Sequence, residues 1–190
     1  MARSNISPIK IRQFLVTVHL LFAGFMTPAF LLLAVSGGLY LLGNKGQVTT
    51  QVINLPASAS LDFKSKTLNS DVQALLTGVG IEHRFEYVKK RSDTKLHLRP
   101  TSRRYIEINQ TKNGLTASYK TPNLQKSMIE LHKGHGPKLF KLYQKFVALA
   151  LLFVIIGGVF VGLLARPYRR KTVASIILGS TVFLILALFA

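Results

Sequence analysis

Three long apolar blocks divide the chain, and a polar segment covering residues 44–145 separates the first block from the second. An α-helix rises about 1.5 Å per residue, so about 20 apolar residues cross a hydrocarbon core of about 30 Å. Each block is long enough for one crossing. The pattern therefore predicts an integral membrane α-helical protein with transmembrane helices at residues 14–43, 146–165 and 172–190.

The first apolar block contains no Asp, Glu, Lys or Arg, and its one ionisable side chain is His19. Pro28 lies in the middle of this block and predicts a kink, because proline removes a backbone donor. An ionisable group at membrane depth indicates a functional site. A histidine that hydrogen-bonds a neighbouring helix or headgroup water is the other interpretation, and both remain open. The helical face of His19 carries mostly small residues, which favours contact with protein: Ala23, Thr27, Phe30, Ala34 and Gly38.

The segment between the first two blocks shows the patterns of a small α+β domain. Residues 44–60 are a polar connector with at most one short strand. A capping-box pattern at Ser70–Gln73 predicts a short helix that ends at Gly78 or Gly80. Alternating apolar residues predict one hairpin over residues 85–99 and a second over residues 106–119, with Asn113-Gly114 at its turn. Thr121-Pro122 then predicts the start of another helix.

The charges are distributed very unevenly along the chain. The formal net charge is +18. All charged residues in the short flanks of the apolar blocks, residues 1–13 and 166–171, are basic. Short basic segments stay in the cytoplasm, whereas long translocated domains are nearly exempt from this rule. We therefore expect a bacterial inner-membrane protein with a cytoplasmic N-terminus, a cytoplasmic loop at residues 166–171 and a periplasmic domain at residues 44–145. All seven acidic residues lie in that domain: Asp62, Asp71, Glu82, Glu86, Asp93, Glu107 and Glu130.

The first block has the basic flank of a signal peptide, and Ala34-Val35-Ser36 is a weak cleavage motif. Its apolar run is far longer than a signal-peptide core, so we expect an uncleaved anchor. Gly158 and Gly162 in the second span, like Ser175 and Gly179 in the third, have the small-xxx-small spacing of closely packed membrane helices. Membrane lipids are the expected surroundings of all three spans.

The residue types limit the chemistry that this chain can perform. It contains no cysteine, which excludes thiolate catalysis and cysteine-ligated metal sites within the chain. His132 and His135 are spaced as H-x-x-H, but no third ligand follows at fixed spacing, so we predict no metal site and no catalytic residue. Nucleic acid is not an expected partner, because the basic domain is predicted to lie outside the cytoplasm. His97 lies between Lys95 and Arg99 on one strand face, which suits either a solvated surface or an anion such as a carboxylate-rich chelate or a lipid headgroup.

Several short motifs resemble the PepSY-associated transmembrane family. Arg12-Gln13-Phe14-Leu15, followed by His19 and LLLAVSGGLYLLG, resembles the opening helix of that family. Leu131–His135 is similarly placed before a span that carries Gly157-Gly158 and ends in Arg166-Pro167. The segment YIEINQTKNGLTAS is similar to the strand–turn–strand of the PepSY module.

This resemblance implies a small PepSY-like extracytoplasmic domain and a role in reductive handling of ferric chelates. It implies haem b as cofactor, with His19, His132 and His135 as candidate ligands, and an accessory or electron-transfer component of a membrane ferric reductase. The second and third spans lack histidine, so bis-histidine ligation favours a homodimer or a subunit of a membrane complex. The alternative is a non-redox membrane anchor whose PepSY-like domain binds or regulates a partner protein.

Overall fold

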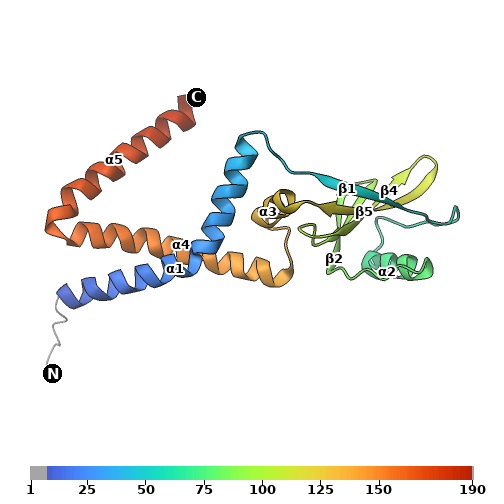
Figure 1. Ribbon diagram of the computed structural model, residues 1–190, viewed down its shortest axis with the longest axis horizontal. Coiled ribbons are helices and arrows are strands. Elements are labelled where there is room, and N and C mark those ends of the chain that lie inside the picture. The colour runs from blue at the N-terminus through green and yellow to red at the C-terminus, as the bar shows by residue number, and fades with distance from the viewer. Residues whose placement is uncertain (1–7, 190) are drawn as a thin grey trace, which may run out of the picture. The chain divides into compact units, whose positions relative to one another are not determined.

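The computed structural model describes residues 8–189, and the first seven residues of the predicted basic lead lie outside this range. Within the described residues, three helices are long and apolar enough to cross a membrane. They are α1 (Pro8–Leu41), α4 (Lys138–Leu164) and α5 (Arg166–Phe189) (Figure 1). The predicted transmembrane helices are thus found, and the chain is a multi-pass membrane protein.

All three long helices begin before the apolar blocks predicted for them, and α1 begins at Pro8 instead of residue 14. The predicted loop at residues 166–171 is helical, since α5 begins at Arg166 directly after α4. Proline is tolerated in the first helical turn, where its missing N–H has no partner to lose, so Pro167 does not prevent this early start. Helix α4 begins at Lys138, eight residues before the apolar block, because polar residues extend a helix that already has an apolar core.

The chain forms two compact units, whose boundaries fall within α1 and α4. We call residues 8–29 with 145–189 the helical unit, and residues 30–144 the sheet unit. The first boundary lies between Ala29 and Phe30, next to Pro28. Within the helical unit, α4 and α5 meet closely where Gly162 faces Thr172, and a Cβ at position 162 would collide with the threonine side chain. The small residue is therefore required for this tight turn between helices.

The sheet unit contains one five-stranded antiparallel sheet in the order β1-β5-β4-β3-β2 (Figure 1). Both predicted hairpins are confirmed: β2 pairs with β3, and β4 pairs with β5 across Asn113-Gly114. The first strand of the connector pairs with β5, in the register Ile53 opposite Ala117. The strands span the following residues: β1 Val48–Ile53, β2 Tyr87–Ser92, β3 Lys95–Arg99, β4 Tyr105–Thr111 and β5 Gly114–Pro122.

Two short helices accompany the sheet, and both begin differently from expectation. Helix α2 (Leu68–Gly78) starts before the predicted capping box, and the Thr67 and Ser65 hydroxyls donate to the Asp71 carboxylate. Strand β5 extends through Pro122, so α3 (Leu124–His132) is capped by Asn123, whose side chain accepts from the Lys126 N–H. The start of α2 thus follows a local hydrogen-bond network, whereas the start of α3 follows the end of the paired strand β5.

The core of the sheet unit lies between α2 and one face of the sheet. Alternate strand residues point to opposite faces, so the apolar set of each strand is buried together. Figure 1 shows α2 along this side of the sheet. The side chains with no measurable exposure are Val72, Leu76, Leu96, Leu98, Ile106 and Ile108. The α+β domain is therefore stabilised by one apolar layer, and the opposite sheet face is free to carry polar groups.

Candidate functional site

The three histidines predicted as cofactor ligands lie in different parts of the fold. His19 is on α1 in the helical unit, whereas His132 and His135 lie in the sheet unit, at and just after the end of α3. Each unit therefore presents its histidines in a separate environment.

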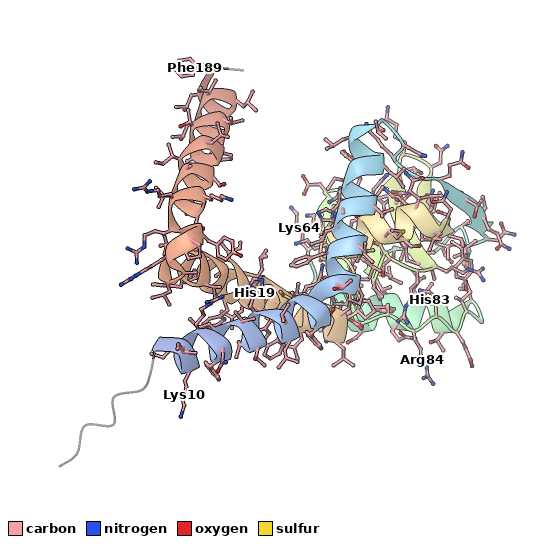
Figure 2. All side chains as sticks on the ribbon, turned by 60° about the vertical axis from the view of Figure 1, so that its left-hand side comes forward. Lys10, His19, Lys64, His83, Arg84 and Phe189 are labelled. Carbon is pink, nitrogen blue, oxygen red and sulfur yellow. The ribbon has the colours of Figure 1, made fainter. Side chains whose placement is uncertain are left out.

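His19 packs against the second membrane helix of its own unit (Figure 2). A Cβ at Gly158 would lie 3.2 Å from the His19 Cε1 atom, so the glycine leaves room for the imidazole ring. The His19 Nδ1 atom is buried and has no hydrogen-bond partner among the described residues. The prediction that His19 faces protein is thus confirmed. An unpaired buried nitrogen in a membrane helix is energetically costly.

His132 is held by a hydroxyl group from α1. Its Nδ1 atom lies 2.9 Å from the Ser36 Oγ atom, and this hydroxyl donates its single hydrogen to the Leu32 carbonyl at 2.6 Å. The Ser36 oxygen must therefore accept from His132, which assigns the ring proton to Nδ1. The lone pair is then on Nε2, and the side chain that carries it is exposed. This is the tautomer in which a histidine binds a metal through Nε2.

An apolar pocket of about 310 Å³ adjoins His132. Its size is at the lower end of the range for small-molecule and cofactor sites, so a macrocycle would be enclosed only in part. Lys133 and Lys45 place their ammonium groups 5.1 Å and 5.7 Å from the centre of the Tyr40 ring at this site. The pocket is lined by Ser36, Gly37, Tyr40, Leu41, Ile129, His132 and Lys133.

His135 belongs to a separate polar cluster at the end of β3. Its Nδ1 atom lies 2.7 Å from the Glu130 carboxylate, which also accepts the Thr101 hydroxyl at 2.6 Å. Thr101 in turn accepts from the buried Arg99 guanidinium at 2.7 Å, and Arg99 lies 3.8 Å from Glu130. Glu130 therefore joins the end of α3 to the sheet and compensates a buried cation.

A second charged group lies on the sheet face opposite α2. We call this the polar sheet face. The strand register places Lys89, Lys95, His97, Arg99, Glu107, Asn109 and Lys120 on it, and we include Arg91 from the irregular part of β2, because its charge acts on His97 and Arg99. His97 is not merely solvated, as one of the sequence interpretations held. Its Nε2 atom lies 2.8 Å from Glu107, and its ring centre lies 5.4 Å from that of Tyr105, with the two ring planes tilted by 47°.

The electrostatics of these clusters give a definite pH dependence. Burial lowers the pKa of His97 and of His135, and the carboxylate partners only partly oppose this effect. Burial alone would raise the pKa of Glu107 and Glu130. Hydrogen bonds and nearby cations outweigh it, so both pKa values lie below the ordinary one. Desolvation also raises the pKa of Tyr105 to about 12.

We expect the sheet unit to lose stability on acidification in two stages. A histidine with a lowered pKa binds its proton more readily when unfolded, so stability falls as the pH drops below the ordinary histidine value of about 6.5. The carboxylates act in the same direction below about pH 4.5, because their folded pKa values are depressed. Thermal unfolding of the full chain in detergent at a series of pH values measures this. The His97→Gln/His135→Gln protein should show a flatter profile between pH 6.5 and pH 5, and an unchanged slope there would contradict the assignment.

Metal binding by this chain was not predicted, and among residues 8–189 no group of three or more His, Asp or Glu side chains is arranged to hold a metal ion. Sequence reasoning also missed the partners of the histidines. Ser36 stood out only as part of a weak cleavage motif, and Thr101 gave no signal, because their contacts with His132 and Glu130 join positions 96 and 29 residues apart. Arg99 was noted only as a neighbour of His97.

Comparison of the chain with protein-family models, with curated proteins and with solved structures finds no match. The resemblance to the PepSY-associated transmembrane family therefore rests on the short sequence motifs alone.

Proposed function

We propose that this chain is a PepSY-type protein of the bacterial inner membrane that binds haem b and transfers electrons in the reductive handling of ferric chelates. The observation that supports this best is the hydrogen bond between Ser36 and His132. It fixes the tautomer that leaves Nε2 available, and it is the kind of second interaction that orients histidine ligands in metal sites. In this proposal residues 44–145 are periplasmic, and the chain is an accessory or electron-transfer component of a membrane ferric reductase.

The residues at the pocket fit a haem group in three respects. His132 offers an unprotonated Nε2 atom, the adjoining surface is largely apolar, and Lys133 and Lys45 supply cations near Tyr40. Bound there, haem would supply one-electron redox chemistry, and the axial ligand and its surroundings set the potential. His135 is a weaker candidate, because Glu130 and the polar cluster already engage it.

His19 is the second candidate ligand, as the resemblance implies, and its Nδ1 atom makes no hydrogen bond with the described residues. The pocket beside His132 would enclose a macrocycle only in part, so a histidine of another chain could also contribute to holding it. A homodimer, in which the same surface meets itself, or a complex with another subunit supplies such a ligand.

Optical spectroscopy of the purified full chain tests the haem proposal. Protein from haem-replete cells should show a Soret band, and His132→Ala should abolish it, because removing an axial ligand releases the cofactor. His83→Ala is the matched control, since His83 packs edge-on against Tyr119 in the same unit and is not a candidate ligand. His19→Ala forms the second arm. Wild-type protein without a Soret band, or an unchanged spectrum in both variants, would overturn the proposal, whereas loss with His19→Ala alone would move the ligand to the helical unit.

The second candidate function is a non-redox membrane anchor whose PepSY-like domain binds or regulates a partner. Helix α2 covers one side of the sheet, while the polar sheet face carries exposed cations, which favours a binding role. Haem-free wild-type protein that still binds a ligand on this face would favour this second function.

A further inference from the structure

The polar sheet face has more positive than negative charge, and its acids are already fully engaged. Glu107 accepts from His97 at 2.8 Å and from Asn109 at 3.3 Å, and both Lys95 and Lys120 lie within 4 Å of it. Glu130 is similarly occupied by Thr101, His135 and Lys126. The remaining cations of the face therefore cannot be neutralised by these two carboxylates.

Two of those cations are exposed and lack partners. Lys89 and Arg91 make no ion pair or hydrogen bond through their side chains with any described residue, whereas their neighbour Lys90 pairs with Asp93 at 2.8 Å. The register shifts between Lys90 and Ser92, so Arg91 sits in an irregular part of β2. A β-bulge of this kind redirects a side chain and commonly lies beside a functional site.

Arg91 lies close to the buried groups of the face. Burial is the main cause of the lowered pKa values of His97, Arg99 and His135, and the positive charge of Arg91 lowers all three further. Arg99 is only 3% exposed, yet its Nε atom has no hydrogen-bond acceptor among the described residues, and the buried Asn109 Oδ1 atom likewise lacks a donor. The Arg99 Nε–H is therefore an uncompensated donor beneath the exposed cations, whereas the Asn109 oxygen is an acceptor that an anion would not satisfy.

The spacing of the cations limits the size of the anion. Residues two apart on a strand are separated by about 7 Å, and neighbouring strands lie about 4.8 Å apart. Lys89 lies opposite His97, so Lys89 and Lys95 are diagonal neighbours about 8 Å apart, and Arg91 lies in the irregular stretch of β2 beside them. A small molecule with two or three carboxylates can span this distance. An arginine binds a carboxylate through two parallel hydrogen bonds, so it holds this group more strongly and in a more defined orientation than the ammonium of a lysine does.

We propose that the polar sheet face binds a small polycarboxylate anion, with Arg91 and Lys89 as its principal contacts and Lys95 beside them. The further identification of this anion as an iron chelate that receives electrons rests on the function proposed above. Binding of the anion itself requires no haem, so the two proposals fail separately.

Calorimetric titration of the full chain in nanodiscs of neutral lipid with citrate, a tricarboxylate probe, tests the proposal. The wild type should bind citrate with a dissociation constant of about 1 mM or tighter, and added salt should weaken it. The Arg91→Gln/Lys89→Gln protein should bind at least about tenfold more weakly, because each charge-assisted hydrogen bond contributes substantially. Both side chains are exposed, so neither change is expected to disturb the core.

The matched control is Arg84→Gln/Lys112→Gln, which removes the same net charge from exposed positions outside the polar sheet face. Figure 2 shows the Arg84 side chain extending away from the rest of the unit. Citrate affinity of this control should stay within about twofold of wild type. Failure of the wild type to bind citrate, or an equal loss in both double variants, would overturn the proposal.

A lipid headgroup offers related anionic chemistry, and binding of the protein to vesicles with and without phosphatidylglycerol separates it from a free anion. If Arg91→Gln/Lys89→Gln lowers vesicle binding but leaves citrate affinity unchanged, the polycarboxylate proposal is overturned. If citrate affinity falls as expected while wild-type protein has no Soret band, this inference stands and the haem proposal alone fails.

Discussion

Replacement of Glu130 by alanine is expected to lower the free energy of unfolding of the sheet unit by about 3–5 kcal/mol. The Arg99 side chain is 4% exposed, and Glu130 is the acid that compensates its charge, directly at 3.8 Å and through Thr101. Removal of the carboxylate leaves a buried cation without a counter-ion and an orphaned Thr101 hydroxyl. The energetic loss therefore exceeds that of an ordinary surface ion pair.

Hydrogen exchange of the β3 and β4 amides in the full chain measures this effect, since the most protected amides report the stability of the whole unit. Glu82→Ala is the control, because Glu82 is exposed and forms no ion pair or side-chain hydrogen bond with the described residues. Its effect should stay within about 0.5 kcal/mol. Equal protection of the Glu130→Ala and Glu82→Ala proteins would show that Arg99 does not depend on Glu130.

Replacement of Gly46 by alanine is expected to destabilise the junction between the connector and α3 by about 3 kcal/mol or more. Gly46 has φ of +68°, in the left-handed region that side chains disfavour. An alanine Cβ would also lie 2.5 Å from the Lys126 backbone nitrogen and 2.9 Å from the Asn123 Oδ1 atom. These atoms form the N-cap of α3, so the clash cannot be relieved by rotating a flexible side chain.

Gly43→Ala separates the two causes of this loss. Gly43 has φ of +83°, but a Cβ there would meet no atom within 4 Å. Its replacement should therefore cost only the backbone strain, about 1 kcal/mol. Exchange of the α3 and β1 amides distinguishes the variants. Similar protection in the two would mean that the close approach of Gly46 to the cap contributes nothing.

The positions of the helices and hairpins follow from local properties of the sequence. A membrane helix requires only length and apolar composition, because lipid rather than a specific neighbour covers its side chains. The hairpins could equally be predicted from the sequence, since Asn113-Gly114 provides the required turn and alternating residues identify the buried face. Their existence was therefore predictable, although the helix starts at Leu68, Leu124 and Arg166 were not, because partners outside each helix set them.

The sequence by itself thus determined the membrane spans, the two hairpins and the histidines with candidate chemistry. The tertiary structure alone decided which groups those histidines meet: Ser36 reaches His132 across 96 positions, and Thr101 reaches Glu130 across 29. It also decided that β1 pairs with β5 and that Lys89 and Arg91 are left without acidic partners. These contacts depend on the folded path of the chain, because a hydrogen bond between distant residues leaves no period or spacing in the sequence that local patterns can report.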